Sequence, residues 1–125
     1  MEKQERKFDI NDRLINLAVC IIKVCESVNN SKASSHLVGQ LIRSGTSPSL
    51  NYGEAQSAES RSDFIHKLKI SVKELRESYN SLQIIQRAEL STNNNLIDST
   101  IKECNELIAI LVKSIETAQR NKQSE

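Results

Sequence analysis

The stretch SDFIHKLKISVKELRESYNSLQIIQRAEL, residues 62–90, decides the fold of this chain. Its apolar residues recur at alternating steps of three and four, the spacing that lines up side chains along one face of an α-helix. The residues of this seam are Ile65, Leu68, Val72, Leu75, Tyr79 and Leu82. At about 1.5 Å per residue, the stretch predicts one amphipathic helix roughly 40 Å long that begins near Ser62 or Asp63.

Two further segments carry the same pattern. Residues 11–28 and residues 96–119 each have apolar residues at alternating steps of four and three. Leu17, Ile22 and Val24 widen the first of these seams into the broad apolar stripe that a bundle helix needs. The connections between helices are short and polar, and short connections favour antiparallel neighbours.

The segment between the first helix and residues 62–90 is less regular. Leu37, Val38, Leu41 and Ile42 indicate the apolar face of a helix over residues 34–57, with Ser34 or Ser35 capping its first turn. After Arg43, serine, glycine and alanine dominate, and Pro48 removes one helical hydrogen bond. We expect a helix here that is kinked at the proline.

These four segments predict an all-α fold, an up-down antiparallel four-helix bundle with a kinked second helix. Composition agrees, because three glycines, one proline and 3% aromatic residues are too few for a β-sandwich. The 125 residues suffice for one domain over residues 1–125 with a core that needs no metal or disulfide. We therefore expect no metal site and no cofactor.

Charge and apolar runs limit the location and partners of the protein. The 17 basic and 16 acidic residues give a formal net charge of +1, so any basic surface must come from uneven distribution. The N-terminus lacks a signal-peptide pattern, and no apolar run is long enough to span a bilayer. Three cysteines with no metal-ligand spacing indicate a reducing compartment. The expected location is the cytoplasm.

One face of the helix at residues 34–57 is polar along its whole length. It can be an ordinary solvated face, or a buried polar network between helices or subunits in which Arg43 needs a carboxylate partner. Glu74 or Glu77 could supply that carboxylate. The residues of this face are Gln40, Arg43, Ser47, Asn51 and Glu54.

The helix at residues 62–90 also carries a second stripe, which is basic. Lys69, Lys73, Arg76 and Arg87 lie on it, and we call these four residues the basic strip. Three of them have no acidic residue three or four positions away, so the strip could follow a phosphate backbone. The alternative interpretation is an ordinary solvated helix face.

One pair of residues resembles an enzyme motif. Arg61 and His66 are separated by four residues, the short spacing found in the all-helical ribonucleases of the HEPN superfamily. The minority hypothesis is therefore a ribonuclease in which both residues work on an RNA phosphate. No other spacing indicates a nucleophile with a base, and the chain is expected not to be an enzyme.

The segment from Leu37 to Ile85 resembles a family of bacterial four-helix-bundle proteins that are encoded in intervening sequences of large-subunit ribosomal RNA genes. The family pattern is a Gln-Leu-x-Arg-Ser helix, then Ser-x-x-x-Asn-x-x-Glu, then an acidic-aromatic start to a long helix. The matching residues are Gln40, Leu41, Arg43, Ser44, Ser47, Asn51, Glu54, Asp63, Phe64, Ser71, Glu74 and Leu75.

This resemblance implies a homopentamer of four-helix bundles around a central pore. The family is similar to the accessory protein of diversity-generating retroelements, which implies RNA or DNA as a partner. The leading hypothesis is a non-enzymatic oligomeric scaffold that binds nucleic acid through the basic strip. The alternative is a protein-protein interaction module that does not bind nucleic acid.

Overall fold

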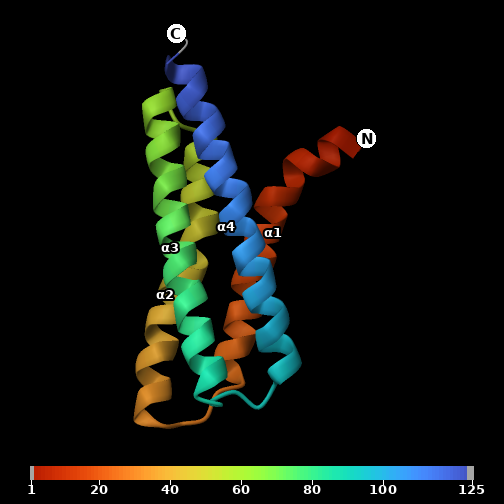
Figure 1. Cartoon of the computed structure of the whole chain (residues 1–125), viewed down its shortest axis with the longest axis vertical. Coiled ribbons are helices and arrows are strands. Elements are labelled where there is room, and N and C mark those ends of the chain that lie inside the picture. The colour runs from red at the N-terminus through yellow and green to blue at the C-terminus, as the bar shows by residue number, and fades with distance from the viewer. Residues whose placement is uncertain (1, 124–125) are drawn as a thin grey trace.

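The chain folds as an all-α four-helix bundle, which confirms the predicted fold class. The computed structural model describes the backbone of residues 2–123 and the side chains of residues 10–121. Figure 1 shows the helices in the order in which they follow one another. They are α1 (Glu2–Glu26), α2 (Lys32–Gln56), α3 (Arg61–Arg87) and α4 (Asn94–Gln123).

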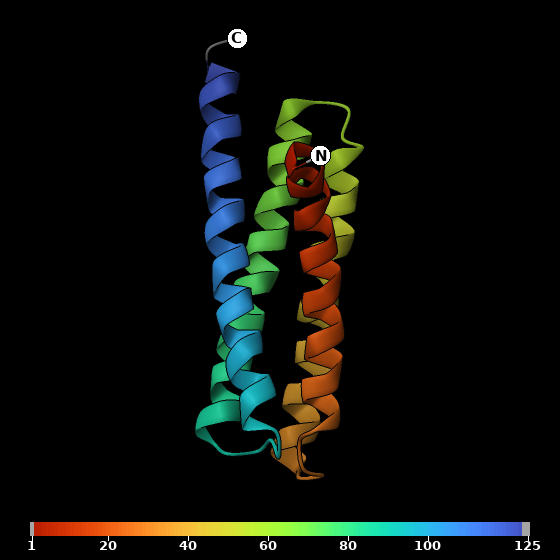
Figure 2. The same ribbon diagram turned by 90° about the vertical axis from the view of Figure 1, so that its right-hand side faces the viewer.

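The helices form a closed square in which each packs against its neighbours along the chain. α2 lies between α1 and α3, and α4 completes the square by packing against both α3 and α1. Figure 2 shows that both chain ends lie at one end of the bundle, as four antiparallel helices require. None of the four helices, over the residues described, has the length and apolarity that crossing a bilayer requires.

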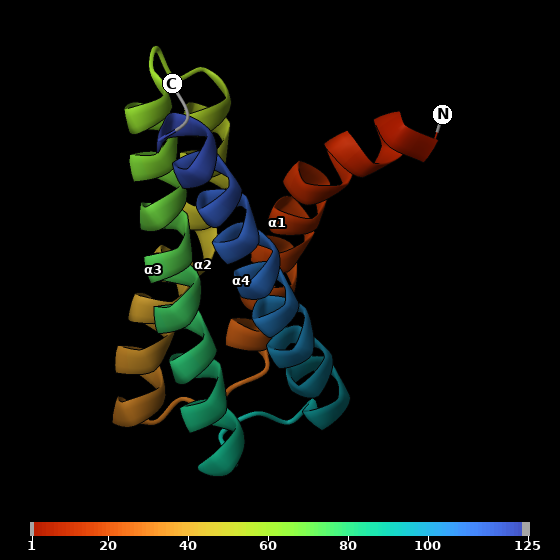
Figure 3. The same ribbon diagram turned by 45° about the horizontal axis from the view of Figure 1, so that its top comes forward.

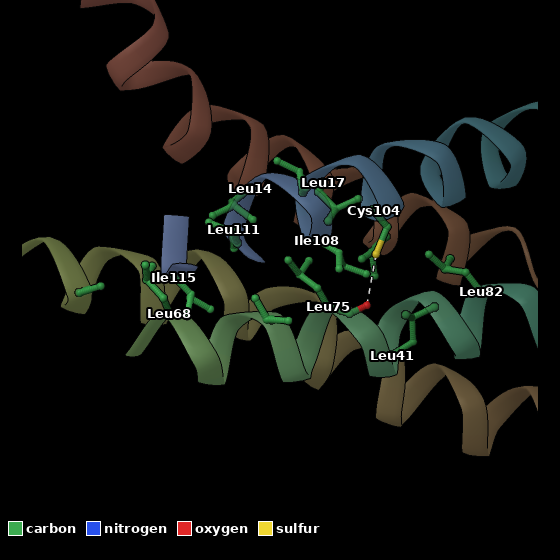
Figure 4. Close-up of a cluster of buried hydrophobic side chains, with 14 of the residues drawn as sticks. Leu14, Leu17, Leu41, Leu68, Leu75, Leu82, Cys104, Ile108, Leu111 and Ile115 are labelled. Atoms are coloured by element: carbon green, nitrogen blue, oxygen red, sulfur yellow. Dashed lines mark hydrogen bonds between the residues drawn. The ribbon is translucent and has the colours of Figure 1, made fainter. Parts of the chain in front are cut away.

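The core consists of the apolar seams that the sequence indicates. Figure 4 shows the buried leucines and isoleucines of all four helices pointing toward one another. Cys104 belongs to this core, and its Sγ donates to the Leu75 carbonyl oxygen at 3.3 Å. The largest fully buried side chains are those of Leu14, Leu17, Ile21, Val24, Leu41, Leu68, Leu75, Leu82, Ile85, Ile97, Leu107 and Leu111.

Two apolar residues assigned to inward faces are on the surface instead. The side chains of Ile22 on α1 and Ile42 on α2 are 42% and 41% exposed. The predicted stripes were too broad at these positions.

α2 is the helix that departs most from local propensity. It continues through Pro48, although the proline ring offers no N–H to the Ser44 carbonyl one turn earlier. Pro48 is buried, and its own carbonyl accepts a hydrogen bond of 3.1 Å from the Ser71 hydroxyl of α3. Gly45 faces α1, where a Cβ atom would stand 2.6 Å from Ile21 Cδ1. Close packing on both sides therefore stabilises a poor helical sequence.

The helix starts lie slightly earlier than expected. Ser31 caps α2 by accepting from the Ser34 N–H at 3.1 Å, so Ser34 is inside the helix and Ser35 follows it. Ser60 caps α3 by accepting from the Asp63 N–H at 3.1 Å. α1 begins well before residue 11, at Glu2, and α4 extends to Gln123.

The two loops at the closed end of the bundle pair with each other. The Asn29 N–H donates to the Leu90 carbonyl at 3.0 Å, and the Thr92 N–H donates to the Ser27 carbonyl at 2.9 Å. These bonds frame an isolated antiparallel bridge between Val28 and Ser91. The α1–α2 and α3–α4 connections are thus held as one unit, which keeps the two helix pairs in register.

Candidate nucleic-acid interface

The basic strip lies along an exposed side of α3. Lys69, Lys73, Arg76 and Arg87 are all exposed to solvent. Their steps of four and three keep the first three on one side of the helix, and Arg87 follows three turns later. Arg87 donates a hydrogen bond of 2.9 Å to Gln83 on the preceding turn. The strip is therefore carried by a single, well-formed helix, with Arg87 about 16 Å beyond Arg76 along its axis.

Two of the three acidic residues of α3 are bound by α2 instead of by the strip. Arg43 Nη1 donates to Glu74 Oε2 at 3.2 Å, and Arg43 Nη2 donates to the Glu77 carboxylate. The hydrogen bond to Glu77 and the negative charges of both carboxylates raise the pKa of Arg43. One guanidinium from α2 therefore binds two carboxylates of α3.

This arrangement separates the charges of α3. Glu77 follows Lys73 by four residues and would be its natural ion-pair partner on the helix surface. Arg43 binds that carboxylate instead, and no ion pair joins Lys69, Lys73 or Arg76 to any other residue that the structure describes. Arg43 therefore offsets part of the negative charge on the edge of α3 that faces α2, while the strip keeps its positive charge.

The remaining residues of the polar face of α2 form separate local contacts. Asn51 Nδ2 donates to the Ser47 carbonyl at 3.1 Å and lies 2.9 Å from the Ser47 hydroxyl. Glu54 forms an ion pair with Lys67 of α3 at 3.2 Å. Gln40 is exposed. Because the Arg43 side chain is 57% exposed, this face of the folded chain is a row of surface pairs, not a buried network.

Buried polar contacts between α2 and α3 come from serines whose pairing the sequence did not predict, although Ser44 and Ser71 belong to the family pattern. The hydroxyls of Ser44 and Ser78 are fully buried and lie 2.8 Å apart, and the Ser71 hydroxyl is buried against α2. Small hydroxyl side chains let the two backbones approach while satisfying each other's hydrogen bonds. The sequence signals for this contact were the Ser44 and Ser71 positions of the family pattern and the high serine content of both helices.

A second ion-pair cluster joins α1 to α4. Arg13 donates from Nε and Nη2 to the two carboxylate oxygens of Glu103 at 2.8 and 2.7 Å, and it also pairs with Glu106 at 3.0 Å. The side chains of Arg13 and Glu103 are only 21% and 33% exposed. The cluster fixes α1 against α4 near the point where α1 enters the bundle.

The structure separates the two residues of the ribonuclease hypothesis. Arg61 begins α3 and His66 lies five positions later, so their side chains leave the helix about 140° apart. Both residues are exposed. Among the described residues, no three histidine, cysteine or carboxylate side chains gather closely enough to hold a metal ion.

A family pattern and a solved structure are both similar to this chain. The pattern that defines the 23S rRNA-intervening sequence proteins matches residues 6–113. A solved structure from Bacteroides thetaiotaomicron, described as a protein with unknown function from the S23 ribosomal protein family, is 31% identical and superposes with a TM-score of 0.77. The similarity covers 85% of this chain and 97% of that one. No curated protein matches the sequence.

The match spans α1 to α3 and most of α4, and it includes both the polar face of α2 and the basic strip. The chain belongs to the 23S rRNA-intervening sequence protein family.

Proposed function

We propose that this protein is a non-enzymatic scaffold that associates with copies of itself and binds RNA through the basic strip. The observation that carries the proposal is the charge separation on α3. Arg43 binds Glu74 and Glu77, while Lys69, Lys73 and Arg76 remain exposed and without ion pairs among the described residues.

The geometry of the strip suits a phosphate backbone. From Lys69 to Arg87 the strip extends for about 27 Å along one helix, which is enough to contact several successive phosphates. Lysine and arginine side chains bind phosphate oxygens without selecting a base, so we expect affinity with weak sequence preference. In a ring of copies the strip would be repeated, and the local positive potential would exceed what a net charge of +1 suggests.

Membership of the family also supports the proposal of RNA binding and self-association. The description of the family names the intervening sequence of 23S rRNA, and this supports RNA as the nucleic acid to test. The resemblance to the accessory protein of diversity-generating retroelements points to nucleic acid and to a pentameric ring.

Filter binding with a structured RNA at two salt concentrations tests the proposal. Wild type is expected to retain the RNA at low salt and to lose most of it at high salt, because binding releases condensed counterions. A strip variant with Lys69→Gln, Lys73→Gln and Arg76→Gln should retain little RNA. A matched control carries Lys23→Gln, Lys32→Gln and Lys102→Gln, three exposed lysines outside the strip, and should bind like wild type.

Two results would contradict the proposal. The first is absence of retention at low salt. The second is equal loss of retention in the strip variant and its control, which would mean that only total charge matters. RNA recovered from the filters is expected to be intact. Cleavage that disappears in His66→Ala would instead support the ribonuclease hypothesis.

A further inference from the structure

One corner of the bundle lacks its fourth helix. The first turns of α1 diverge from the other three helices, as Figure 1 and Figure 3 show from two directions. Where α1 is absent, the structure has a groove of about 820 Å³ between the end of α2, the start of α3 and the last turns of α4. Its lining includes Ala55, Arg61, Phe64, Ile110, Lys113 and Ala118.

The groove continues the surface of α4 that contacts α1. Ile110 and Lys113 line the groove, and each lies seven residues after a carboxylate that binds Arg13 of α1, Glu103 and Glu106 respectively. Residues seven apart share one side of a bundle helix. The groove is therefore the position that the first turns of α1 would occupy if they stayed against α4.

The same chain has a helical ridge without a partner. Ile15, Val19 and Ile22 lie at steps of four and three along the outer side of α1, and they are 45%, 44% and 42% exposed. Three large aliphatic side chains in one row form a contiguous apolar patch of the kind that marks an interaction surface. Asp12 and Glu26 continue the row at its two ends, three or four residues beyond the aliphatic residues.

We propose that the ridge of one copy (Asp12, Ile15, Val19, Ile22 and Glu26) occupies the groove of a second copy. This inference rests on the self-association proposed above and names the two surfaces that make the contact. The ridge supplies aliphatic residues to a groove lined by Phe64, Ile110 and Ala118, and its acidic ends carry the charge opposite to that of Lys113. Glu59 also lines the groove, so the acidic ends of the ridge must lie away from it. The seven-residue step from Ile15 to Ile22 spans about 10 Å, and the groove follows α4 for about 16 Å.

The contact is head-to-tail, because ridge and groove are different surfaces of one chain. Each copy that accepts a ridge still offers its own ridge to another copy. Repetition leads to a closed ring when the rotation between copies divides a full turn, and otherwise to a filament. A ring satisfies every ridge and every groove, so it gives a finite mass in solution.

Light scattering on complementary variants tests this contact. The ridge variant is Val19→Glu and the groove variant is Thr117→Arg, both at exposed positions, so the bundle should still fold. Each variant alone should be monomeric at a concentration where wild type is an oligomer. An equimolar mixture should give a one-to-one dimer and nothing larger, since only one intact ridge and one intact groove remain. Ile84→Glu, at a 51% exposed isoleucine of α3, is the matched control and should keep the wild-type mass.

Several outcomes would overturn the inference. A groove variant that keeps the wild-type mass would show that the ridge does not need the groove. A mixture that stays monomeric, or an Ile84→Glu variant that dissociates, would also exclude the contact. Ile15→Glu replaces the ridge variant if Val19→Glu loses its helical circular dichroism. Monomeric wild type would remove self-association altogether, whereas RNA retention on filters tests the basic strip separately.

Discussion

Gly45 is the residue at which a side chain is least tolerated. A Cβ atom there would lie 2.6 and 2.8 Å from two carbons of Ile21, whose β-branched side chain is fully buried. We predict that Gly45→Ala destabilises the fold by about 1–3 kcal/mol through overpacking. Gly53→Ala is the matched control, because nothing lies within 4 Å of its Cβ position. That change should stabilise α2 by about 0.5–1 kcal/mol, and thermal unfolding of both variants checks the opposite signs.

Glu89 holds an unfavourable backbone conformation after α3. Its φ is 55°, and the Leu90 N–H donates to the Ile85 carbonyl at 3.1 Å across it. This is the Schellman arrangement, which usually has glycine at that position. Glu89→Gly is expected to raise stability by about 0.5–1 kcal/mol, whereas Ala88→Gly, at an ordinary φ of −82°, should lower it. Chemical denaturation in which both variants shift in the same direction would refute this explanation.

Burial of Cys104 gives the fold a dependence on alkaline pH. Desolvation, assisted by the Glu103 charge, raises the pKa of the Cys104 thiol to about 12. An unfolded thiol has a pKa of about 8.5, so its contribution to stability is complete below that pH and is lost as pH rises toward 12. Between pH 8 and 10 the unfolding midpoint of Cys104→Ala should therefore fall less steeply than that of wild type. Equal slopes for wild type and Cys104→Ala would contradict this assignment.

The sequence predicted a contact between named residues only where spacing along the helices and their expected adjacency were enough to determine it. It predicted Glu74 or Glu77 as the carboxylate for Arg43 because the two helices were expected to be neighbours. It missed the Arg13–Glu103 pair and the Ser44–Ser78 contact. Both join residues that are far apart in the chain, and each depends on the relative height of two helices, which no local pattern encodes.

At the scale of helices, the ion pairs between α2 and α3 determine whether Lys73 of the basic strip stays without an acidic partner. Removing Arg43 should free Glu77 to pair with Lys73 four residues earlier. We predict that Arg43→Ala weakens RNA retention severalfold although Arg43 is not in the strip. The unfolding midpoint should change little, because Arg43 is exposed. Adding Glu77→Gln to Arg43→Ala should restore retention. Loss that persists in the double variant would show that Arg43 contacts the RNA itself.

The existence of the four helices was predictable, and their ends were less so. Heptad seams follow from local spacing, and they correctly identified the core of α3 and α4. The seam of α1 could not indicate that the helix extends back to Glu2, because the residues before Ile10 are mostly polar. The pairing of the loops at Val28 and Ser91 could not be predicted from local sequence either, because its hydrogen bonds join two separate connections.

At the scale of the whole molecule, the surfaces that indicate function are the ones that helix packing leaves exposed. They are the ridge, the groove and the basic strip. The fold follows from binary patterning, whereas the ridge and the groove appear only once α1 is seen to leave the bundle. Ile22 illustrates the difference, because its spacing fits an inward face and the closed square leaves it outside. The basic strip was visible in the sequence, but its lack of acidic partners depends on how Arg43 lies in three dimensions.

The salt dependence of RNA affinity tests the central claim most directly. The slope of log Kobs against log salt concentration counts the phosphates that the protein neutralises, at about 0.7–0.9 per phosphate. We predict that the Lys69→Gln, Lys73→Gln and Arg76→Gln variant has a slope smaller in magnitude by about two, whereas the control with Lys23, Lys32 and Lys102 changed keeps the wild-type slope. Equal slopes for wild type and the strip variant would contradict the assignment of RNA binding to α3.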